Sequence, residues 1–489
     1  DALRDPPEEP VPSGLQATLR PYQRRGFSWL STLARLGLGA CLADDMGLGK
    51  TLQLITHVLA RRPQADAPAL VVCPTSVLGN WAREIARFAP ELRVLRYHGL
   101  DRDADALAEA DVVLTTYCLL VRDVDALQEL RWDVLALDEA QAIKNPDSKR
   151  ARAARALSAR HRVALSGTPV ENRLLELWSI MEFLVPGLLG TRAAFRRNVA
   201  LPIERFGDED AADSLRLGVA PFILRRLKSD PTVIDDLPDK IERRAWCALS
   251  REQRSLYRDV TETHLAEIAN GEPSERRGRV LALLTALKQV CNHPAHYTKE
   301  PGPLAGRSGK LDRFDDLVDT VLEQGERALV FTQYKQMGAL LQQHLSERYG
   351  LAAPFLHGGT PPEGREEMVR AFQEDDGAPP LLLISLRAGG TGLNLTRATH
   401  VIHYDRWWNP AVEDQATDRA YRIGQRNNVL VHKMITADTL EQRIDEVLEG
   451  KRALASSVVG SGESWVAELD DDALRRLVAL GDDDLDGES

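Results

Sequence analysis

Short runs of aliphatic and β-branched residues recur in two parts of the chain, and each is separated from the next by enough polar chain for a helix. The runs cover residues 69–73, 111–116, 132–137 and 162–165, and later 328–331, 381–385, 400–403 and 429–432. Strands that alternate with helices are typical of βα units on a parallel sheet. The pattern therefore predicts an α/β protein built from two lobes.

Between the two series, at about residues 171–305, the strand signal fades and charged amphipathic stretches such as 251–269 and 279–290 replace it. We interpret this interval as helical insertions and a linker. The predicted division is an acidic, Pro-rich linker (1–14), a first lobe with a helical insertion at about 171–220 (15–225), a linker and helical insertion leading into lobe two (226–305), a second lobe (306–455) and an acidic tail (456–489). An apolar repeat over 466–480 is compatible with an acidic amphipathic helix in that tail.

Length and composition narrow the class of protein. The 489 residues are enough for about two to four domains, and 43% hydrophobic with 28% charged residues is ordinary for a globular protein. No apolar run reaches the length of about 18 residues that a spanning helix needs, so we expect no membrane contact. The chain begins at Asp1 without a basic and apolar leader, which favours a cut fragment over a secreted precursor and a cytoplasmic, nucleoid-associated location.

The five cysteines are scattered and contain no Cys-x-x-Cys pair. This argues against a disulfide framework and against a zinc site. Cys41, Cys73 and Cys118 lie in or beside apolar runs, so we expect them in the core.

Net charge is −11, but residues 468–489 hold nine acidic and two basic residues, which leaves −4 for the rest of the chain. Basic residues gather in two stretches, at 150–162 and at 225–228. Solvated helix faces and a nucleic-acid groove are both open interpretations of these stretches.

Candidate phosphate chemistry begins at Asp44-Asp-Met-Gly-Leu-Gly-Lys-Thr51. It departs from the strict P-loop pattern because Asp44 stands where the first glycine belongs. The apolar run before it and the helical pattern after it give the strand–loop–helix order that phosphate binding at a helix N-terminus requires. Lys50 would contact the β- and γ-phosphates and Thr51 would ligate Mg²⁺. A lone Gly-Lys-Thr also arises often by chance.

Two adjacent carboxylates end the run at 132–137. Asp138 at a strand tip can hold the metal, usually through water, while Glu139 polarises the attacking water. An acidic turn is the alternative for an isolated pair. The next run ends in Ser166-Gly-Thr-Pro169, which could sense the γ-phosphate or could be a simple Gly-Pro turn.

Near the far end, Arg419 and Arg422 lie three residues apart, and Gln415 precedes Arg419 by four. In a helix this spacing would direct three polar groups from one face toward one target. Arginines so placed commonly bind phosphate, because the guanidinium is always charged and its fork matches phosphate oxygens. For this group to meet Lys50, one nucleotide must sit between two domains.

Taken in order, seven segments resemble the helicase motifs of superfamily two: Tyr22-Gln23, Asp44–Thr51, Asp138–Gln141, Ser166–Pro169, 330–334, 385–394 and 415–425. Three further segments, 221–226, 291–294 and 405–410, together with the end of the last one, 422–425, are similar to those of the Swi/Snf-type DNA translocases. The match covers residues 19–448. Many family members carry His at the position of Gln141, whereas archaeal and bacterial members carry Gln, so the chain resembles that branch. No bromo-, chromo- or histone-tail-reading segment is recognisable, so nucleosomes are not implied.

This resemblance implies two RecA-like parallel-sheet lobes with a nucleotide cleft between them, and ATP and Mg²⁺ as cofactors. It implies catalytic roles for Lys50, Asp138, Glu139, Arg419 and Arg422. Nucleotide contacts are implied for Arg20, Gln23, Gly47, Gly49, Lys50, Thr51, Gly392 and Gln415, with Mg²⁺ at Thr51 and Asp138. DNA-backbone contacts are implied for Thr75, Trp81, Thr115, Thr116, Gln333, His357, Gly358, Arg387 and Trp408, although Trp81 and Trp408 could equally be core aromatics.

The expected function is therefore an ATPase that moves along double-stranded DNA with little sequence preference and without strand separation. An RNA-dependent or strand-separating helicase would share every nucleotide motif. A catalytically silent DNA-binding scaffold is a third interpretation. A DNA-bound protein such as RNA polymerase is a further candidate partner.

Overall fold

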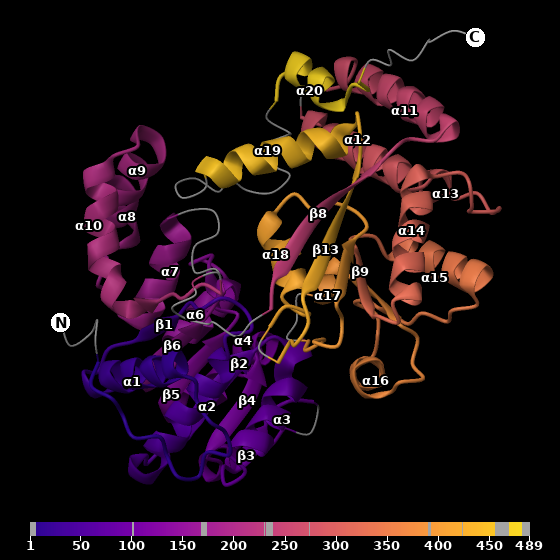
Figure 1. Cartoon of the computed structure of the whole chain (residues 1–489). Coiled ribbons are helices and arrows are strands. Elements are labelled where there is room, and N and C mark those ends of the chain that lie inside the picture. Colours follow the sequence, from indigo (N-terminus) through magenta and orange to yellow (C-terminus); the bar gives the residue numbers. More distant parts are fainter. Residues whose placement is uncertain are drawn as a thin grey trace, which may run out of the picture. The chain divides into compact units, whose positions relative to one another are not determined.

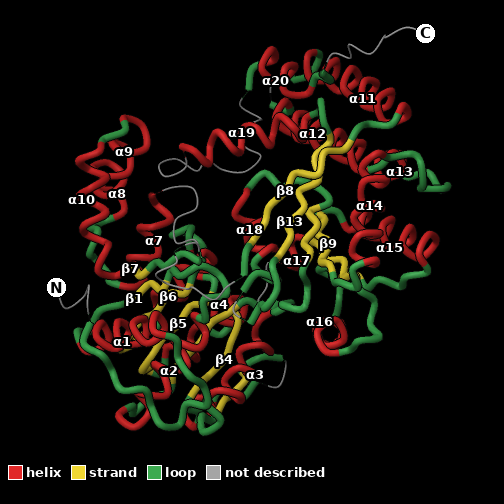
Figure 2. The backbone as a smooth tube through the Cα atoms, viewed as in Figure 1, coloured by secondary structure: helices red, strands yellow, loops and turns green. Residues whose placement is uncertain are grey.

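The computed structural model describes residues 6–99, 102–167, 174–228, 230, 238–272, 274–389, 393–422, 424–454 and 469–481. Two compact units make up the chain, Asp1–Asp236 and Leu237–Ser489. Each unit has its own parallel sheet, visible as neighbouring strands in Figure 1 and Figure 2. The predicted α/β class with two parallel-sheet lobes is confirmed.

A seven-stranded sheet in the order β3-β4-β2-β5-β6-β1-β7 forms the centre of the first unit. Its strands are β1 (Ala40–Leu42), β2 (Ala69–Cys73), β3 (Val94–Arg96), β4 (Val112–Thr116), β5 (Arg131–Asp138), β6 (Ser158–Leu165) and β7 (Ile223–Leu224). Every pairing in it is parallel. β2 and β4 are buried along their whole length, because a parallel sheet is covered on both faces.

Most helices of the first unit lie between successive strands, but the last four follow one another between β6 and β7 with no strand among the described residues there. The helices of this unit are α1 (Pro21–Arg35), α2 (Lys50–Arg61), α3 (Leu78–Phe88), α4 (Tyr117–Arg122), α5 (Val124–Gln128), α6 (Lys149–Ala156), α7 (Leu174–Leu184), α8 (Arg192–Phe195), α9 (Leu201–Phe206) and α10 (Glu209–Val219). In Figure 1, α8, α9 and α10 stand together away from the sheet. Trp178, Phe195 and Ala200 form a small core of their own there.

Six strands make the second sheet, in the order β10-β11-β9-β12-β13-β8. They are β8 (Lys240–Cys247), β9 (Ala328–Thr332), β10 (Phe355–Leu356), β11 (Leu381–Ser385), β12 (His400–His403) and β13 (Val429–Thr436). β8 lies in the interval where the pattern indicates only helices and a linker. Half of its side chains, those of Lys240, Glu242, Arg243 and Arg244, are charged and exposed, as on an edge strand, so it carries no apolar run.

The second unit also contains the helices α11 (Arg251–Ala269), α12 (Arg276–Asn292), α13 (Pro294–Thr298), α14 (Gly309–Glu323), α15 (Lys335–Tyr349), α16 (Pro362–Glu374), α17 (Leu386–Gly389), α18 (Pro410–Thr417), α19 (Leu440–Leu454) and α20 (Asp471–Val478). The amphipathic stretch at 251–269 is confirmed as α11. In the acidic tail, α20 is shorter than the repeat over 466–480 suggested. Its buried face is Leu474, Leu477 and Val478, packed in one core with residues of α11, α12 and α19.

Four of the five cysteines are buried, but Cys118 is exposed. The expectation of a core position is wrong for Cys118, because the strand ends at Thr116 and α4 turns this side chain outward. None of the described helices is long and apolar enough to cross a membrane.

Two buried histidines are in contact inside the first unit. Nε2 of His57 on α2 lies 3.0 Å from Nδ1 of His161 on β6, and Ser31 Oγ lies 3.3 Å from His57 Nδ1. Burial lowers the pKa of both side chains, and it lowers that of His161 to about 3. Both histidines are therefore neutral in the folded protein near neutral pH.

We expect the free energy of unfolding of the first unit to fall on acidification. Because an unfolded histidine takes up its proton near pH 6.5, the unfolded chain binds more protons below that pH, and the stabilisation present above it is lost at up to about 1.4 kcal/mol per pH unit for each histidine. Urea unfolding at pH 7.5 and 5.5, read by hydrogen exchange at the amides of α2 and β6, measures this. His161→Gln should reduce the loss and the exposed His98→Gln should not; equal losses in both variants would contradict the explanation.

Candidate nucleotide-binding site

The loop between β1 and α2 has the backbone shape of a phosphate-binding loop. Gly47 and Gly49 adopt positive φ angles of 84° and 76°, which side-chain-bearing residues rarely adopt. A Cβ at Gly49 would also lie only 2.4 Å from Gln23 Nε2. The loop leads straight into the N-terminus of α2 at Lys50, where backbone N–H groups can bind an anion.

Lys50 extends over this loop. Its Nζ donates to the carbonyl oxygens of Asp44 at 2.5 Å and Asp45 at 3.3 Å. The ammonium is half-buried and near enough to Asp138 that its charge lowers the pKa of that carboxyl. Thr51, the next residue of α2, is also half-buried.

Tyr22 and Gln23 hold the loop from the side of α1. The Tyr22 hydroxyl and Gln23 Nε2 both donate to the carbonyl oxygen of Leu48, at 3.0 and 3.2 Å. Gln23 Oε1 accepts the backbone N–H of Arg20 at 3.0 Å, and Gln23 is 3% exposed. Gln23 Nε2 thus holds the loop while Oε1 caps the start of α1, and an adenine contact from Gln23 or Arg20 stays a prediction.

Asp44, the departure from the strict P-loop pattern, is fully buried and ion-paired. Arg226 Nε donates to Asp44 Oδ1 at 2.8 Å, and Nη2 pairs with Oδ2. Arg226 Nη2 also donates to Gln53 Oε1 at 2.8 Å. Arg226 therefore lies neither on a solvated helix face nor in a nucleic-acid groove. It fastens the segment after β7 to the start of the phosphate-binding loop.

The two carboxylates lie at the carboxyl end of β5, as predicted. Glu139 adopts a left-handed conformation with φ 51°, and its N–H donates to Asp138 Oδ1 at 3.0 Å. Trp81 Nε1 donates to Asp138 Oδ2 at 2.8 Å. Burial and the neighbouring charge of Glu139 raise the pKa of Asp138 to about 7, against the opposing effects of Trp81 and Lys50.

Hydrogen bonds join Glu139 to the end of β6. Gln141 Nε2 donates to Glu139 Oε2 at 2.7 Å, and Ser166 Oγ donates to Gln141 Oε1 at 3.2 Å. The amide of Gln141 thus links the carboxylate to the Ser-Gly-Thr-Pro segment. Thr168 and Pro169, the second half of that segment, lie outside the described residues.

Of the DNA contacts expected in the first unit, only Thr75 has an exposed side chain. Thr115 and Thr116 are buried, with Thr115 Oγ1 donating to Tyr97 O at 3.1 Å and Thr116 Oγ1 accepting the N–H of Leu119 at 3.4 Å. Trp81 is 2% exposed, so the core alternative holds for it. Because their side chains are buried, Thr115, Thr116 and Trp81 do not fit a role in direct side-chain contact with DNA. The Thr75 contact stays a prediction.

In the second unit the helix containing Gln415 ends before the two arginines. α18 stops at Thr417, and beyond it the carbonyl of Arg419 accepts the N–H of Leu395 at 2.9 Å. The one-face geometry expected from the spacing is therefore wrong. Arg419 is 2% exposed, whereas Arg422 is half-buried and donates from Nη1 to Leu393 O at 3.0 Å.

The remaining predicted residues of the second unit are placed as follows. The N–H of Gln333 donates to Asp405 Oδ1 at 2.9 Å, and His357 Nδ1 accepts the N–H of Gly359 at 3.0 Å while Gly358 is exposed. Trp408 is 5% exposed with Lys288 Nζ 4.7 Å from its ring centre, so the core alternative holds there too. Gly392 and the side chain of Arg387 lie outside the described residues.

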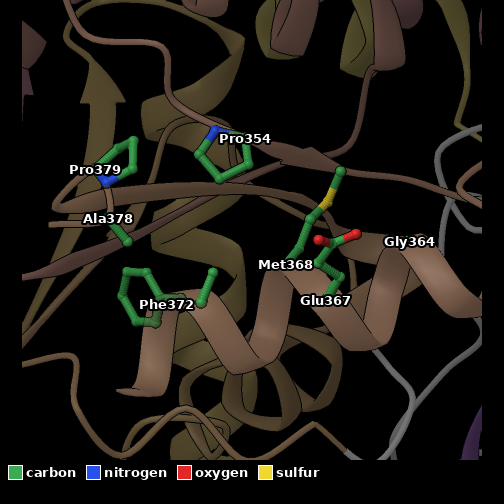
Figure 3. A pocket seen from close by; sticks show the side chains of 8 residues that line it. Pro354, Gly364, Glu367, Met368, Phe372, Ala378 and Pro379 are labelled. Atoms are coloured by element: carbon green, nitrogen blue, oxygen red, sulfur yellow. The ribbon is translucent and has the colours of Figure 1, made fainter. Parts of the chain in front are cut away.

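One pocket in the second unit, of about 240 Å³, contains none of the predicted site residues. Figure 3 shows Met368 and Phe372 of α16 facing Pro354 and Pro379, with Glu367 nearby. Its lining is almost wholly apolar, and it holds no cation that could bind a phosphate. It is therefore not a nucleotide site.

No cluster of three or more His, Cys, Asp or Glu side chains suited to a metal is found among the described residues. The hydroxyl of Thr51 and the carboxylate of Asp138 are the hard oxygen donors that Mg²⁺ prefers, and Mg²⁺ commonly binds with few protein ligands and several waters. The donor set fits the predicted ion.

Sequence reasoning missed two contacts of this site. Arg226 belongs to a segment quoted for the family resemblance, but its partner Asp44 is 182 residues away and nothing local points to it. For Trp81 the sequence leaves a DNA contact and a core position open, and neither predicts its bond to Asp138 across 57 residues. The unusual Asp44 in a glycine position was the one local signal that a buried cation was needed.

Comparison with known protein families identifies this arrangement. The model for the SNF2-related domain matches residues 22–296, and that for the helicase conserved C-terminal domain matches residues 309–424. The chain belongs to the SNF2-related family. The resemblance inferred from the ordered motifs is thereby confirmed.

Individual SNF2-related proteins match over most of the chain. YwqA of Bacillus subtilis, a candidate ATP-dependent helicase/translocase, is 46% identical over 98% of this chain and 53% of its own length. The mouse SWI/SNF-related matrix-associated actin-dependent regulator of chromatin subfamily A member 1 is 37% identical over 91% of this chain and 44% of its own length. The chain spans about half the length of these relatives.

A solved structure, the Sulfolobus solfataricus SWI2/SNF2 ATPase core in complex with dsDNA, is 42% identical in sequence. It covers 97% of this chain and 99% of its own, with a TM-score of 0.49.

Proposed function

We propose that this SNF2-related chain is the motor of an ATP-driven translocase on double-stranded DNA, which remodels DNA or protein–DNA complexes without strand separation. The observation that carries this is the joined set of groups in the first unit: a phosphate-binding loop with Lys50, the Asp138–Glu139 pair and the hydrogen-bonded Gln141. A bacterial relative described as a helicase/translocase and a mammalian regulator of chromatin support DNA as the substrate.

In this proposal the loop backbone and Lys50 bind the β- and γ-phosphates of ATP. Mg²⁺, held by Asp138 and Thr51, would neutralise phosphate charge. Glu139 accepts a proton from the attacking water, and Gln141 fixes the orientation of its carboxylate. Ser166 reaches the same amide, so a change at the γ-phosphate can pass to the segment after β6.

Arg422, with Arg419 and Gln415, would complete the site from the second unit. Loss of the γ-phosphate would remove the interaction that favours closure of the two lobes, and alternating closure would advance the DNA. Contacts mainly to the DNA backbone imply weak sequence preference and a steep dependence on salt. A DNA-bound protein such as RNA polymerase would be displaced or remodelled, and DNA as substrate would place the enzyme at the nucleoid.

The nucleic-acid dependence of ATP turnover tests the proposal. We expect duplex DNA to stimulate turnover more than single-stranded DNA or RNA. Glu139→Gln should reduce stimulated turnover by about 10²–10⁴-fold, because general base catalysis contributes on that scale. Strongest stimulation by RNA would favour an RNA-dependent helicase. If the wild-type protein with duplex DNA turns over ATP no faster than Glu139→Gln, a catalytically silent scaffold is favoured.

Strand separation is tested separately. A duplex labelled on opposite strands should stay paired, while a third strand bound as a triplex should be displaced in the presence of ATP. Separation of the duplex itself would contradict translocation without unwinding.

A further inference from the structure

Two buried aromatic side chains donate hydrogen bonds to the same residue, Asp138. Trp81 Nε1 bonds to the carboxylate oxygen Oδ2 at 2.8 Å, and the Tyr117 hydroxyl bonds to the backbone carbonyl at 2.8 Å. Their exposed fractions are 2% and 4%. An indole N–H and a phenol O–H so placed fix both the side chain and the main chain at the tip of β5.

Each aromatic lies close in sequence to residues for which the family resemblance implies DNA contacts, although among them only Thr75 has an exposed side chain. Trp81 is in the first turn of α3, directly after the short 3-10 turn Thr75–Val77. Tyr117 is the first residue of α4, directly after Thr115 and Thr116. A shift of the first turn of α3 or α4 would therefore move a group that donates a hydrogen bond to Asp138.

Two hydrogen bonds restrict the orientation of the Asp138 carboxylate. One oxygen accepts Trp81 and the other accepts the N–H of Glu139. Because the indole nitrogen can only donate, it favours the ionised carboxylate that a metal ligand must be. Small misplacements of catalytic groups are costly, so a movement of less than about 1 Å at α3 or α4 would be felt in the rate.

We propose that Trp81 and Tyr117 are positioning residues that couple DNA at α3 and α4 to the Asp138 carboxylate, so that DNA binding sets the rate of ATP hydrolysis. This inference rests on the proposed function. It gives the two aromatics a role in stimulation rather than in DNA affinity.

Trp81→Phe and Tyr117→Phe test it, because each removes one donor and keeps an aromatic ring. The matched controls are Trp132→Phe and Tyr404→Phe. Trp132 is buried on the same strand β5 and donates to Leu127 O at 3.0 Å; Tyr404 is buried in the second unit and donates to Asn292 O at 3.1 Å.

We expect the ratio of DNA-stimulated to unstimulated turnover to fall about tenfold or more in Trp81→Phe, which loses a hydrogen bond to a charged group. In Tyr117→Phe, which loses a hydrogen bond to a neutral carbonyl, the ratio should fall about three- to tenfold. The Mg²⁺ concentration for half-maximal turnover should rise several-fold in Trp81→Phe. DNA affinity should stay within about twofold of wild type, because the affected groups are buried. Both control variants should keep the wild-type ratio.

An unchanged ratio in Tyr117→Phe, which removes a single oxygen atom, would overturn the inference even if Trp81→Phe fails to fold. A fall in DNA affinity with a normal ratio at saturating DNA would overturn it as well. Measuring DNA stimulation in the wild-type protein distinguishes failure of this inference from failure of the proposed function. No stimulation of the wild type by duplex DNA would end both, whereas normal wild-type stimulation with unaffected variants would end only the coupling.

Discussion

An Arg422→Ala variant is expected to lose DNA-stimulated ATP turnover by about 10³–10⁵-fold, the range that an arginine finger contributes, or about 4–7 kcal/mol of transition-state stabilisation. The reason is that the guanidinium would neutralise charge that develops on the γ-phosphate. Arg422 is half-buried and its Nη1 donates to Leu393 O, so its fork is held in place before a nucleotide binds. Single-turnover ATPase measurements at saturating DNA would report the loss.

Binding should survive this change, because Lys50 and the phosphate-binding loop belong to the first unit. ATP affinity, followed with a fluorescent analogue, and DNA affinity should stay within a few-fold of wild type. Arg422→Lys should recover only part of the rate, since an ammonium lacks the planar fork. The exposed Arg426→Ala is the matched control and should turn over ATP normally. Full activity of Arg422→Ala would remove this residue from the proposed site.

Arg226→Met is expected to lower the free energy of unfolding of the first unit by about 3–5 kcal/mol, the cost of removing one partner of a buried ion pair. Asp44 is fully buried, and Arg226 supplies both charge-assisted bonds to it from a side chain that is itself 10% exposed. Without the arginine an uncompensated charge would remain under the phosphate-binding loop. Urea unfolding monitored at the amides of α2 would measure the loss.

Two controls sharpen this result. Arg225→Met changes the exposed neighbour and should cost less than about 0.5 kcal/mol, as is usual for surface positions. Adding Asp44→Leu to Arg226→Met should recover much of the stability, because replacing both partners with apolar groups can be nearly neutral. If the double variant is no more stable than Arg226→Met alone, the buried charge is not the cause.

The sequence was sufficient for the parts of the fold that rest on periodicity. Each apolar run beginning at 69, 111, 132, 162, 328, 381, 400 and 429 is a strand within a few residues of the predicted bounds. A fully buried parallel strand needs a continuous apolar run, so its signal is strong. The loop before Lys50 and the Asp138–Glu139 pair were also predictable, because their chemistry requires fixed residue types at fixed spacing.

Features that depend on partners distant in sequence were not predictable. After α18 ends at Thr417, the carbonyl of Arg419 bonds to the N–H of Leu395, a contact that the 415–425 spacing does not contain. The same holds for the hydrogen bond of Trp81 to Asp138, which lies 57 residues away in the sequence. The short strands β3, β7 and β10 have two or three residues each and leave no periodic signal.

The pairing of β8 with β13 has a consequence for how the protein folds during synthesis. Lys240 pairs with Val429, so β8 leaves the ribosome long before its partner strand exists. The second sheet closes late, and pairing across such a separation is intrinsically slow. Until then Glu242, Arg243 and Arg244 are the charged residues that discourage β8 from pairing with a wrong strand. The charges that remove the periodic apolar signal of this strand are thus of the kind that discourages an unpaired strand from aggregating.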